Sequence, residues 1–179
     1  MSENVEVGCR CGEVHGWLTG GRNAAVGRIV CYCDDCQAYA HHLGRADILD
    51  SQGGTEVVPV APAALSFDRG KERVVCLRLS SKGLYRWYTT CCKTPLGNVL
   101  SSRLPYIGVP VYIFGDSTAF FGPRIGAIQG KFAIGRPPPG VNGTELAPYC
   151  RYSKNHTKGS WMEILREKLA APVLRAKHR

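Results

Sequence analysis

The sequence predicts a mainly β domain with one short helix inside it and a second helix near the C-terminus. Most of the first 135 residues form short apolar runs with period-two alternation, which is typical of half-buried strands. Two segments combine helix-start signals with helical spacing of apolar residues. We therefore expect a β domain over residues 5–135, a proline-rich linker over 136–150, and a basic helix with its tail over 151–179.

The predicted strands are short and are separated by turn residues. The clearest pair is a hairpin, in which residues 74–79 alternate, Ser80–Gly83 forms the turn, and residues 84–88 return with several aromatic side chains. The same patterning predicts further strands at Gly12–Leu18, Arg28–Cys31, Thr55–Val60, Leu65–Phe67 and Val109–Phe114.

The two predicted helices have recognisable ends. The first begins at Asp34 or Asp35 and stops near Gly44. The second begins at Ser160, where Glu163 completes a capping box, and ends before Pro172. We expect its apolar side to pack against the β domain through Trp161, Ile164, Leu165 and Leu169. The segment 136–140 contains three consecutive prolines and must be extended.

Composition is that of a soluble globular protein, with 44% hydrophobic and 21% charged residues in 179. No apolar run reaches the roughly 18 residues that a membrane span requires. Residues 1–6 lack the features of a secretory signal, so we expect a cytoplasmic protein without a membrane partner. The net charge is +9, and residues 151–179 carry most of the excess. We interpret this tail as a solvated helix face rather than a nucleic-acid-binding segment.

The nine cysteines are the residues of this sequence that most clearly indicate metal binding or redox chemistry. In a reducing compartment, closely spaced cysteines more often bind metal or act in redox chemistry than form disulfides. Cys76 lies in an alternating apolar strand and is expected in the core, and Cys150 is interpreted as a spare thiol. The other seven form three clusters, namely Cys9 and Cys11, then Cys31, Cys33 and Cys36, then Cys91 and Cys92.

The middle cluster, Cys31, Cys33 and Cys36, predicts a metal site with an open position. Its two-residue gap lies at the start of a helix, which lets three sulfurs converge on one ion. Zinc prefers tetrahedral thiolate ligands at about 2.3 Å, and catalytic zinc keeps one position for water or substrate. The helix dipole would also favour the thiolate form of Cys36. The alternative is a buried or redox-active cysteine group that binds no metal.

Cys9 and Cys11 supply only half of a site. Cys92 is the obvious third ligand, and the fourth is either its neighbour Cys91 or a group from elsewhere. A closed site with four ligands would be structural and would tie the N-terminus to the middle of the chain. The alternative is that these cysteines are small core residues.

Three motifs in this order resemble the glutathione-dependent formaldehyde-activating enzyme (GFA) family, which includes centromere protein V. The family has a Cys-x-Cys-Gly motif, a Cys-His-Cys-x-x-Cys-Arg motif, and an aromatic residue before Cys-x-x-Cys-Gly-[Thr/Ser]-Pro-Leu. The matching segments are Cys9–Gly12, Cys31–Gln37 and Tyr88–Leu96, and Arg86–Trp87 also fits. The resemblance covers roughly residues 5–115.

The resemblance implies a β-tent-like fold with two zinc ions. The first and third motifs would hold a structural zinc through Cys9, Cys11 and Cys92. The second motif would hold a catalytic-type zinc through Cys31, Cys33 and Cys36. The family reaction adds glutathione to formaldehyde with formation of a carbon–sulfur bond, so the implied partner is a small thiol such as glutathione.

Four positions depart from the family pattern. Thr89 stands where the third motif has its first cysteine, so Cys91 would have to supply the missing thiolate. Tyr32 replaces the family's histidine, Gln37 its arginine and Lys93 its glycine. The chain is therefore identified as a divergent member in which the zinc sites can persist while the substrate changes or the activity is lost.

The first functional hypothesis is a zinc-dependent carbon–sulfur lyase or ligase acting at Cys31, Cys33 and Cys36. Three thiolates weaken zinc as an acid, so handling a thiol is more natural than making hydroxide. His41 and His42 are either proton carriers or surface residues of the helix. Basic candidates for binding substrate carboxylates are Arg86, Arg103 and Lys93.

Two other hypotheses use the same cysteines. A non-catalytic zinc module would bind a partner through the tail or an exposed strand face. A thiol redox sensor would release zinc when Cys31, Cys33 or Cys36 is oxidised.

Overall fold

The structure is a computed structural model that describes residues 4–25, 27–101 and 104–135. The predicted linker, the C-terminal helix, Cys150 and Arg103 lie outside the described residues. Within the described residues the chain forms ten strands and one α-helix, which confirms the mainly β prediction. No helix in this part of the chain has the length and apolar character needed to cross a bilayer.

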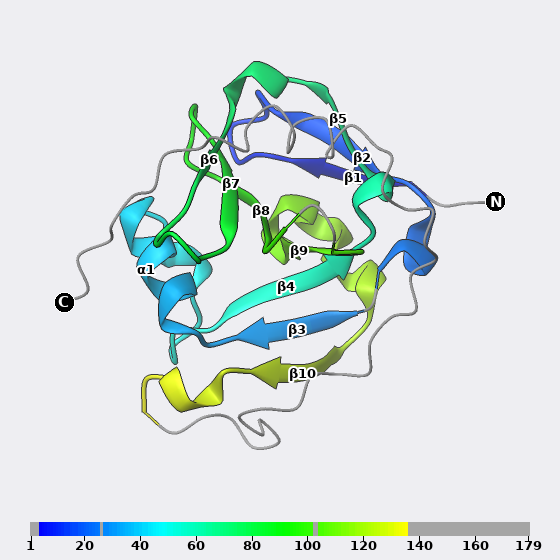
Figure 1. Cartoon of the computed structure of the whole chain (residues 1–179). Helices are drawn as coiled ribbons and strands as arrows, with labels where there is room; N and C mark the ends of the chain where they lie inside the picture. The colour runs from blue at the N-terminus through cyan, green and yellow to red at the C-terminus, as the bar shows by residue number, and fades with distance from the viewer. Residues whose placement is uncertain (1–3, 26, 102–103, 136–179) are drawn as a thin grey trace.

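The strands form two sheets, which are seen together in Figure 1. The smaller sheet is antiparallel in the order β1-β2-β5, with β1 at Val5–Gly8, β2 at His15–Leu18 and β5 at Leu65–Arg69. The larger sheet has the order β10-β3-β4-β9-β8-β7-β6. Its strands are β3 (Arg28–Cys31), β4 (Thr55–Val60), β6 (Val74–Leu77), β7 (Tyr85–Thr89), β8 (Pro95–Val99), β9 (Ile107–Pro110) and β10 (Arg124–Ile128).

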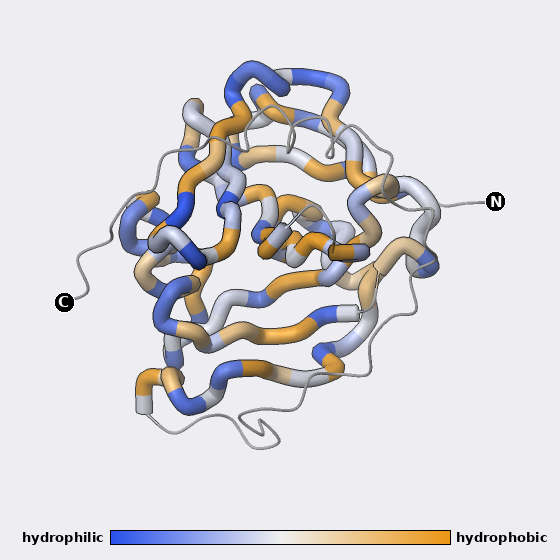
Figure 2. Tube along the Cα trace, in the orientation of Figure 1, coloured by the Kyte–Doolittle hydropathy of each residue, from blue (hydrophilic) through white to orange (hydrophobic). Residues whose placement is uncertain are grey.

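One hydrophobic core joins the two sheets. Val7 and Phe67 from the small sheet lie in the same buried cluster as Val58, Trp87 and Val109 from the large one. Strand β1 alternates as a half-buried strand should, with Val5 and Val7 inside and Glu6 exposed. In Figure 2 the chain between β5 and β6 is strongly hydrophilic, and these residues form an outer edge of the domain.

Short 3-10 helices and the α-helix connect the strands. Helix α1 spans Asp34–His42 and follows β3 directly, as predicted. Its N-cap is Cys33, whose sulfur accepts a hydrogen bond from the Cys36 amide, and Asp34 lies in the first turn, where a negative charge suits the helix dipole. The 3-10 helices are η1 (Gly21–Ala24), η2 (Ala46–Ile48), η3 (Pro62–Ala64), η4 (Lys71–Arg73), η5 (Val111–Phe121) and η6 (Gly130–Phe132).

Most predicted strands are confirmed. The ranges Arg28–Cys31 and Thr55–Val60 match β3 and β4, and Leu65–Phe67 forms the first part of β5. The predicted hairpin is the β6–β7 pair, in which Cys76 lies opposite Trp87.

Two strand predictions were partly wrong, and three strands were missed. The strand expected at Val109–Phe114 ends at Pro110, and the chain continues as η5 with a kink at Gly115, whose φ of 52° suits glycine. The strand expected from Gly12 begins only at His15, because Gly12 has a φ of 77° and belongs to a turn. The missed strands β1, β8 and β10 have only four or five residues each.

Gly16 marks the closest approach of two backbones in the small sheet. A Cβ at this position would collide with the backbone carbonyl of Ser66 and the Cα of Phe67, which lie on the neighbouring strand β5. We expect Gly16→Ala to destabilise the domain by about 1–3 kcal/mol, which chemical denaturation would measure. The matched control is Gly126→Ala, where a Cβ meets nothing within 4 Å, and an equal loss in both variants would contradict this packing.

His15 links the three strands of the small sheet through two carboxylates. Its Nδ1 lies 2.8 Å from Asp68 Oδ1 and its Nε2 lies 2.9 Å from Glu6 Oε1. These partners, Asp68 first, raise the pKa of His15 in the folded state. Its ion pairs therefore contribute full stability below the ordinary histidine pKa and lose it as the pH rises through the raised value. We expect His15→Gln to flatten thermal stability between pH 6 and 8; an unchanged profile would contradict this.

Candidate metal centres

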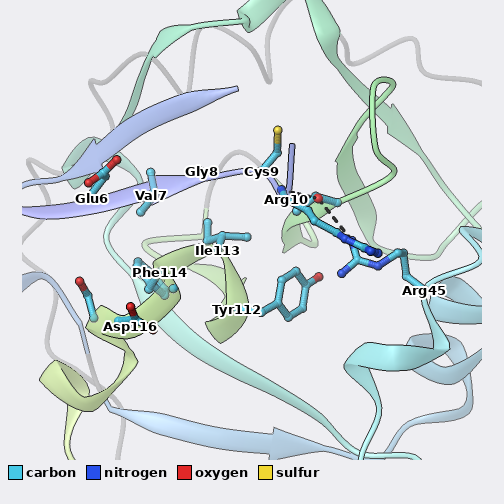
Figure 3. A pocket seen from close by; sticks show the side chains of 13 residues that line it. Glu6, Val7, Gly8, Cys9, Arg10, Arg45, Tyr112, Ile113, Phe114 and Asp116 are labelled. Carbon is cyan, nitrogen blue, oxygen red and sulfur yellow. Dashed lines mark hydrogen bonds between the residues drawn. The ribbon is translucent and has the colours of Figure 1, made fainter. Parts of the chain in front are cut away.

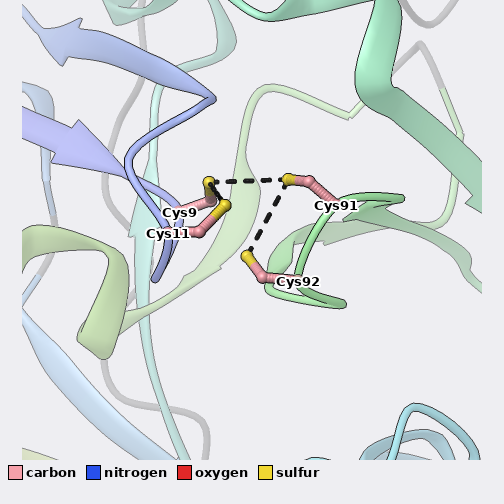
Figure 4. A group of neighbouring side chains, drawn as sticks. All are labelled: Cys9, Cys11, Cys91 and Cys92. Carbon is pink, nitrogen blue, oxygen red and sulfur yellow. Dashed lines mark hydrogen bonds between the residues drawn. The ribbon is translucent and has the colours of Figure 1, made fainter.

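Four cysteines from two distant segments form the first candidate metal centre (Figure 4). Cys9 Sγ lies 3.5 Å from Cys11 Sγ and 3.8 Å from Cys91 Sγ, and Cys91 Sγ lies 3.9 Å from Cys92 Sγ. All four sulfurs lie within 4.8 Å of one another. Sulfurs at the corners of a tetrahedron with 2.3 Å metal–sulfur bonds are about 3.8 Å apart. The four-cysteine group therefore fits a tetrahedral metal ion.

The loop between β1 and β2 positions Cys9 and Cys11. The Cys9 amide donates to the Val14 carbonyl, and the Gly12 amide donates to the Cys9 carbonyl, both at 2.9 Å. The Val14 amide also donates to Cys9 Sγ at 3.2 Å. Amide groups that point at sulfur stabilise its thiolate form, as a metal ligand requires.

The turn between β7 and β8 positions Cys91 and Cys92. The Thr89 amide donates to the Thr94 carbonyl at 3.0 Å, and the Lys93 amide returns to the Thr89 carbonyl at the same distance. Lys93 has a φ of 56°, a conformation that favours glycine.

Thr89 supports the turn from the place where the GFA motif has a cysteine. It is fully buried, its Oγ1 accepts the Thr94 amide at 3.1 Å, and it lies 3.5 Å from Cys92 Sγ. Of the two fourth ligands that the sequence left open, Cys91 is the one that lies within the group. No other candidate ligand joins it among the described residues.

The thiols of the four-cysteine group differ in how readily they lose a proton. Burial raises the pKa of Cys9 and raises the pKa of Cys91 to about 12. Burial also opposes ionisation of Cys92, but hydrogen bonds from Thr89 and Thr94 outweigh it and lower the pKa of Cys92 to about 6. A metal ion must therefore displace protons from Cys9 and Cys91, so its binding should release protons.

Cys31, Cys33 and Cys36 form the second candidate metal centre, the three-cysteine group. Cys31 ends β3, Cys33 caps α1, and Cys36 lies in its first turn. Cys36 Sγ lies 3.9 Å from Cys31 Sγ, and the three sulfurs lie within 4.8 Å of one another. Cys31 and Cys36 are buried, whereas Cys33 is partly exposed. No fourth cysteine, histidine or carboxylate ligand joins them in the described part of the chain.

Without a metal ion, the three-cysteine group concentrates negative charge on Cys36. Hydrogen bonds from Cys31 and Cys33, together with the nearby charge of Arg86, lower the pKa of Cys36 well below its usual value. Hydrogen bonds with Cys33 and Cys36 raise the pKa of Cys31. The bond with Cys31 lowers the pKa of Cys33, but the bond with Cys36 and burial outweigh it and raise the value to about 12.

The other candidates from the sequence lie in different surroundings. His41 and His42 are exposed at the end of α1, as expected for surface residues. Lys93 is exposed, with Nζ 5.6 Å from the centroid of the Tyr88 ring. Arg86 is fully buried and contacts Cys36, so it is enclosed rather than presented to a substrate carboxylate. Cys76 is buried in the main core, as predicted.

The residues at two divergent motif positions hold the backbone around the three-cysteine group. Tyr32 is buried and its hydroxyl donates to Asp50 Oδ2 at 3.2 Å. Gln37 Nε2 donates to the Tyr32 carbonyl at 2.9 Å and to the Phe132 carbonyl at 3.0 Å. Both residues therefore link α1 and β3 to neighbouring loops.

A cavity of about 570 Å³ lies beside the four-cysteine group (Figure 3). Arg10 and Arg45 lie at one end, Glu6 and Asp116 lie toward the other, and Ile113 is among the apolar residues between them. Arg45 is already paired with Asp47, at 2.8 Å. The three-cysteine group does not line this cavity.

Fold and site together define a mainly β protein with two cysteine groups that can each hold a metal ion. The chain belongs to a family of unknown function (DUF6151), whose model matches residues 1–149. The crystal structure of a Rhodobacter sphaeroides protein, a structural genomics target, is similar with a TM-score of 0.43 and 16% identity, over 62% of this chain and 88% of that one. No curated protein matches the chain.

Removing single cysteines should separate the two centres. We expect Cys9→Ser to lose one ion and to lower the melting temperature strongly, because the four-cysteine group joins β1–β2 to β7–β8. We expect Cys33→Ser to lose the other ion with a smaller stability loss, since Cys33 is only partly buried. Elemental analysis with calorimetry would measure both effects.

The control for these variants is Cys76→Ala, which removes a buried thiol outside both groups. It should cost stability and leave the metal content at the wild-type value. A metal content that falls equally in all three variants would contradict the assignment of ligands.

Proposed function

We propose that this chain is a zinc protein with a GFA-like, β-tent-like fold. The four-cysteine group would hold a structural zinc ion, and the three-cysteine group would hold a catalytic-type zinc ion. Thiolate-only ligand sets with tetrahedral spacing are typical of zinc. The sulfur separations of 3.5–3.9 Å support this identity.

The proposed reaction forms or breaks a carbon–sulfur bond between a small thiol, such as glutathione, and a small aldehyde. In the forward direction the thiol sulfur bonds to the carbonyl carbon, and the carbonyl π pair becomes a lone pair on oxygen. The proton lost by sulfur is gained by this oxygen, so the product is a neutral hemithioacetal without any redox change. The reverse reaction is the lyase activity.

The observation that carries the proposal is the difference between the two cysteine groups. The first has four ligands and would enclose its ion, whereas the second has three among the described residues. A zinc ion in such a site offers a position where a substrate thiol can bind as its thiolate. Cys33 is the ligand with partial solvent exposure, and it therefore marks the side from which a thiol would enter.

The protein residues around the three-cysteine group would hold its geometry. The Cys36 amide donates to Cys33 Sγ at 3.3 Å, which orients this sulfur at the start of α1. The Tyr39 hydroxyl donates to the Trp87 carbonyl at 3.1 Å and so fixes α1 against β7. Preorganised ligands of this kind avoid reorganisation when substrate binds.

A second function, a non-catalytic zinc module, is favoured by the burial of two of the three ligands. Cys31 and Cys36 are 8% and 6% exposed, and the group lies where β3 meets α1, with Arg86 of β7 in contact with Cys36. A metal ion there would also stabilise the junction of these elements, as in a structural site.

The test is the rate of exchange between glutathione with formaldehyde and their hemithioacetal, measured by exchange NMR on zinc-loaded protein. We expect the wild type to accelerate exchange over the spontaneous rate, and Cys33→Ala to lose about tenfold or more of this acceleration. Cys76→Ala is the matched control and should retain the wild-type rate. A wild-type protein with two bound ions and only the spontaneous rate would favour the non-catalytic module.

A further inference from the structure

Arg86 is a fully buried arginine on β7, with 0% of its side chain exposed. Its Nη1 lies 3.6 Å from Cys36 Sγ and 3.5 Å from Asn98 Oδ1. Its Nε and Nη2 atoms are buried without a hydrogen-bond partner. A guanidinium is always charged, and burying it is costly unless an anion lies close by.

The anions that can compensate Arg86 are few. Asp35 Oδ2 lies 3.6 Å from Nη2, but its side chain is 38% exposed and is partly solvated. The Tyr39 ring lies 5.2 Å from the guanidinium carbon and contributes only a cation–π contact. Within the part of the chain that the structure describes, the three-cysteine group is the remaining source of negative charge, and Cys36 Sγ contacts Nη1 directly.

Charge balance then depends on the ion in the group. Three thiolates and a divalent ion carry one negative charge, which the guanidinium of Arg86 cancels. A trivalent ion with three thiolates is neutral and leaves the partly solvated Asp35 as the only carboxylate near Arg86 among the described residues. A monovalent ion leaves a net negative charge in the same buried region.

In the four-cysteine group, hydrogen bonds and solvent stabilise the negative charge of the sulfurs. Its sulfurs accept hydrogen bonds from the Val14 amide and the Thr94 hydroxyl, and Cys11 is exposed to solvent. The nearby buried Arg45 has its own carboxylate partner, Asp47. Arg45 therefore has a carboxylate within hydrogen-bond distance, whereas Arg86, the buried arginine beside the three-cysteine group, does not.

We propose that Arg86 is the fixed counter-charge of the three-cysteine group and makes this site selective for a divalent ion over trivalent arsenic. The inference rests on the proposed function, because it requires a metal ion at these cysteines. The inference also deepens the proposed function. When a substrate thiolate joins the zinc ion and the three thiolates, these groups carry two negative charges, and the guanidinium of Arg86 reduces the sum to one. Arg86 acts through Cys36 and is a positioning residue.

The first test compares zinc affinity in the full chain by chelator competition. We expect Arg86→Met to weaken the site at the three-cysteine group by about 10- to 100-fold, and Arg86→Lys to restore part of this loss. The other zinc site should keep its affinity in both variants. The matched control is Arg45→Met, which removes a buried but paired arginine and should leave the three-cysteine group unchanged.

The second test uses arsenite, which releases three waters when it bonds to three thiols. Wild type and Arg86→Met are each titrated with arsenite and with zinc. Binding at the four-cysteine group is the same in the two proteins, so any difference between them reports the three-cysteine group. We expect Arg86→Met to lose zinc affinity while its arsenite affinity is kept or increased. A parallel loss of both ligands would mean a structural defect and would overturn the proposal.

These outcomes separate this inference from the proposed function. If the wild type binds two zinc ions and Arg86→Met binds both with equal affinity, only the role of Arg86 is overturned. If the Arg86 effects appear but the exchange reaction does not, only the proposed activity fails. A wild type that binds no zinc ion at the three-cysteine group would overturn both.

Discussion

The convergence of cysteine sulfurs from distant segments is the constraint on which this structure depends. Cys9 and Cys11 follow the first strand of the small sheet, and Cys91 and Cys92 lie in a turn of the large sheet. Their 3.5–3.9 Å separations require the β1–β2 loop and the β7–β8 turn to lie together. An ion bound there would add its binding free energy to the packing that joins the two sheets. The core residues shared by both sheets reinforce the same junction.

The second cysteine group depends on electrostatics as much as on geometry. Its three sulfurs lie where β3 ends and α1 begins, and the guanidinium of Arg86 closes one side. A buried guanidinium and a group of thiolates stabilise each other, whereas either one alone would be costly. This pairing explains why the region combines an always-charged residue with reactive sulfur inside a β domain.

Local pattern was enough to predict part of this structure. Strands such as Arg28–Cys31 and Thr55–Val60 are short apolar runs with clear ends, and α1 has a capping residue and an acidic first turn. Cysteine spacing predicted which sulfurs gather in each group, because two or more ligands of one ion commonly lie a few residues apart along the chain. Whether Cys91 lies in the four-cysteine group depends on the turn around Lys93. Lys93 has a positive φ, which its residue type does not predict.

Other features required tertiary contacts that local pattern does not encode. Residues 111–114 are all β-branched or aromatic, which favours a strand, but the chain enters η5 after Pro110 and kinks at Gly115. Arg86 was predicted as a candidate for binding substrate carboxylates, but it is buried against Cys36, which is fifty residues away in the sequence.

Anomalous diffraction from crystals grown after zinc loading tests the central claim most directly. The account predicts two zinc peaks, one within bonding distance of Cys9, Cys11, Cys91 and Cys92, and one bonded to Cys31, Cys33 and Cys36. A folded, reduced protein with no zinc peak at either cysteine group would contradict it.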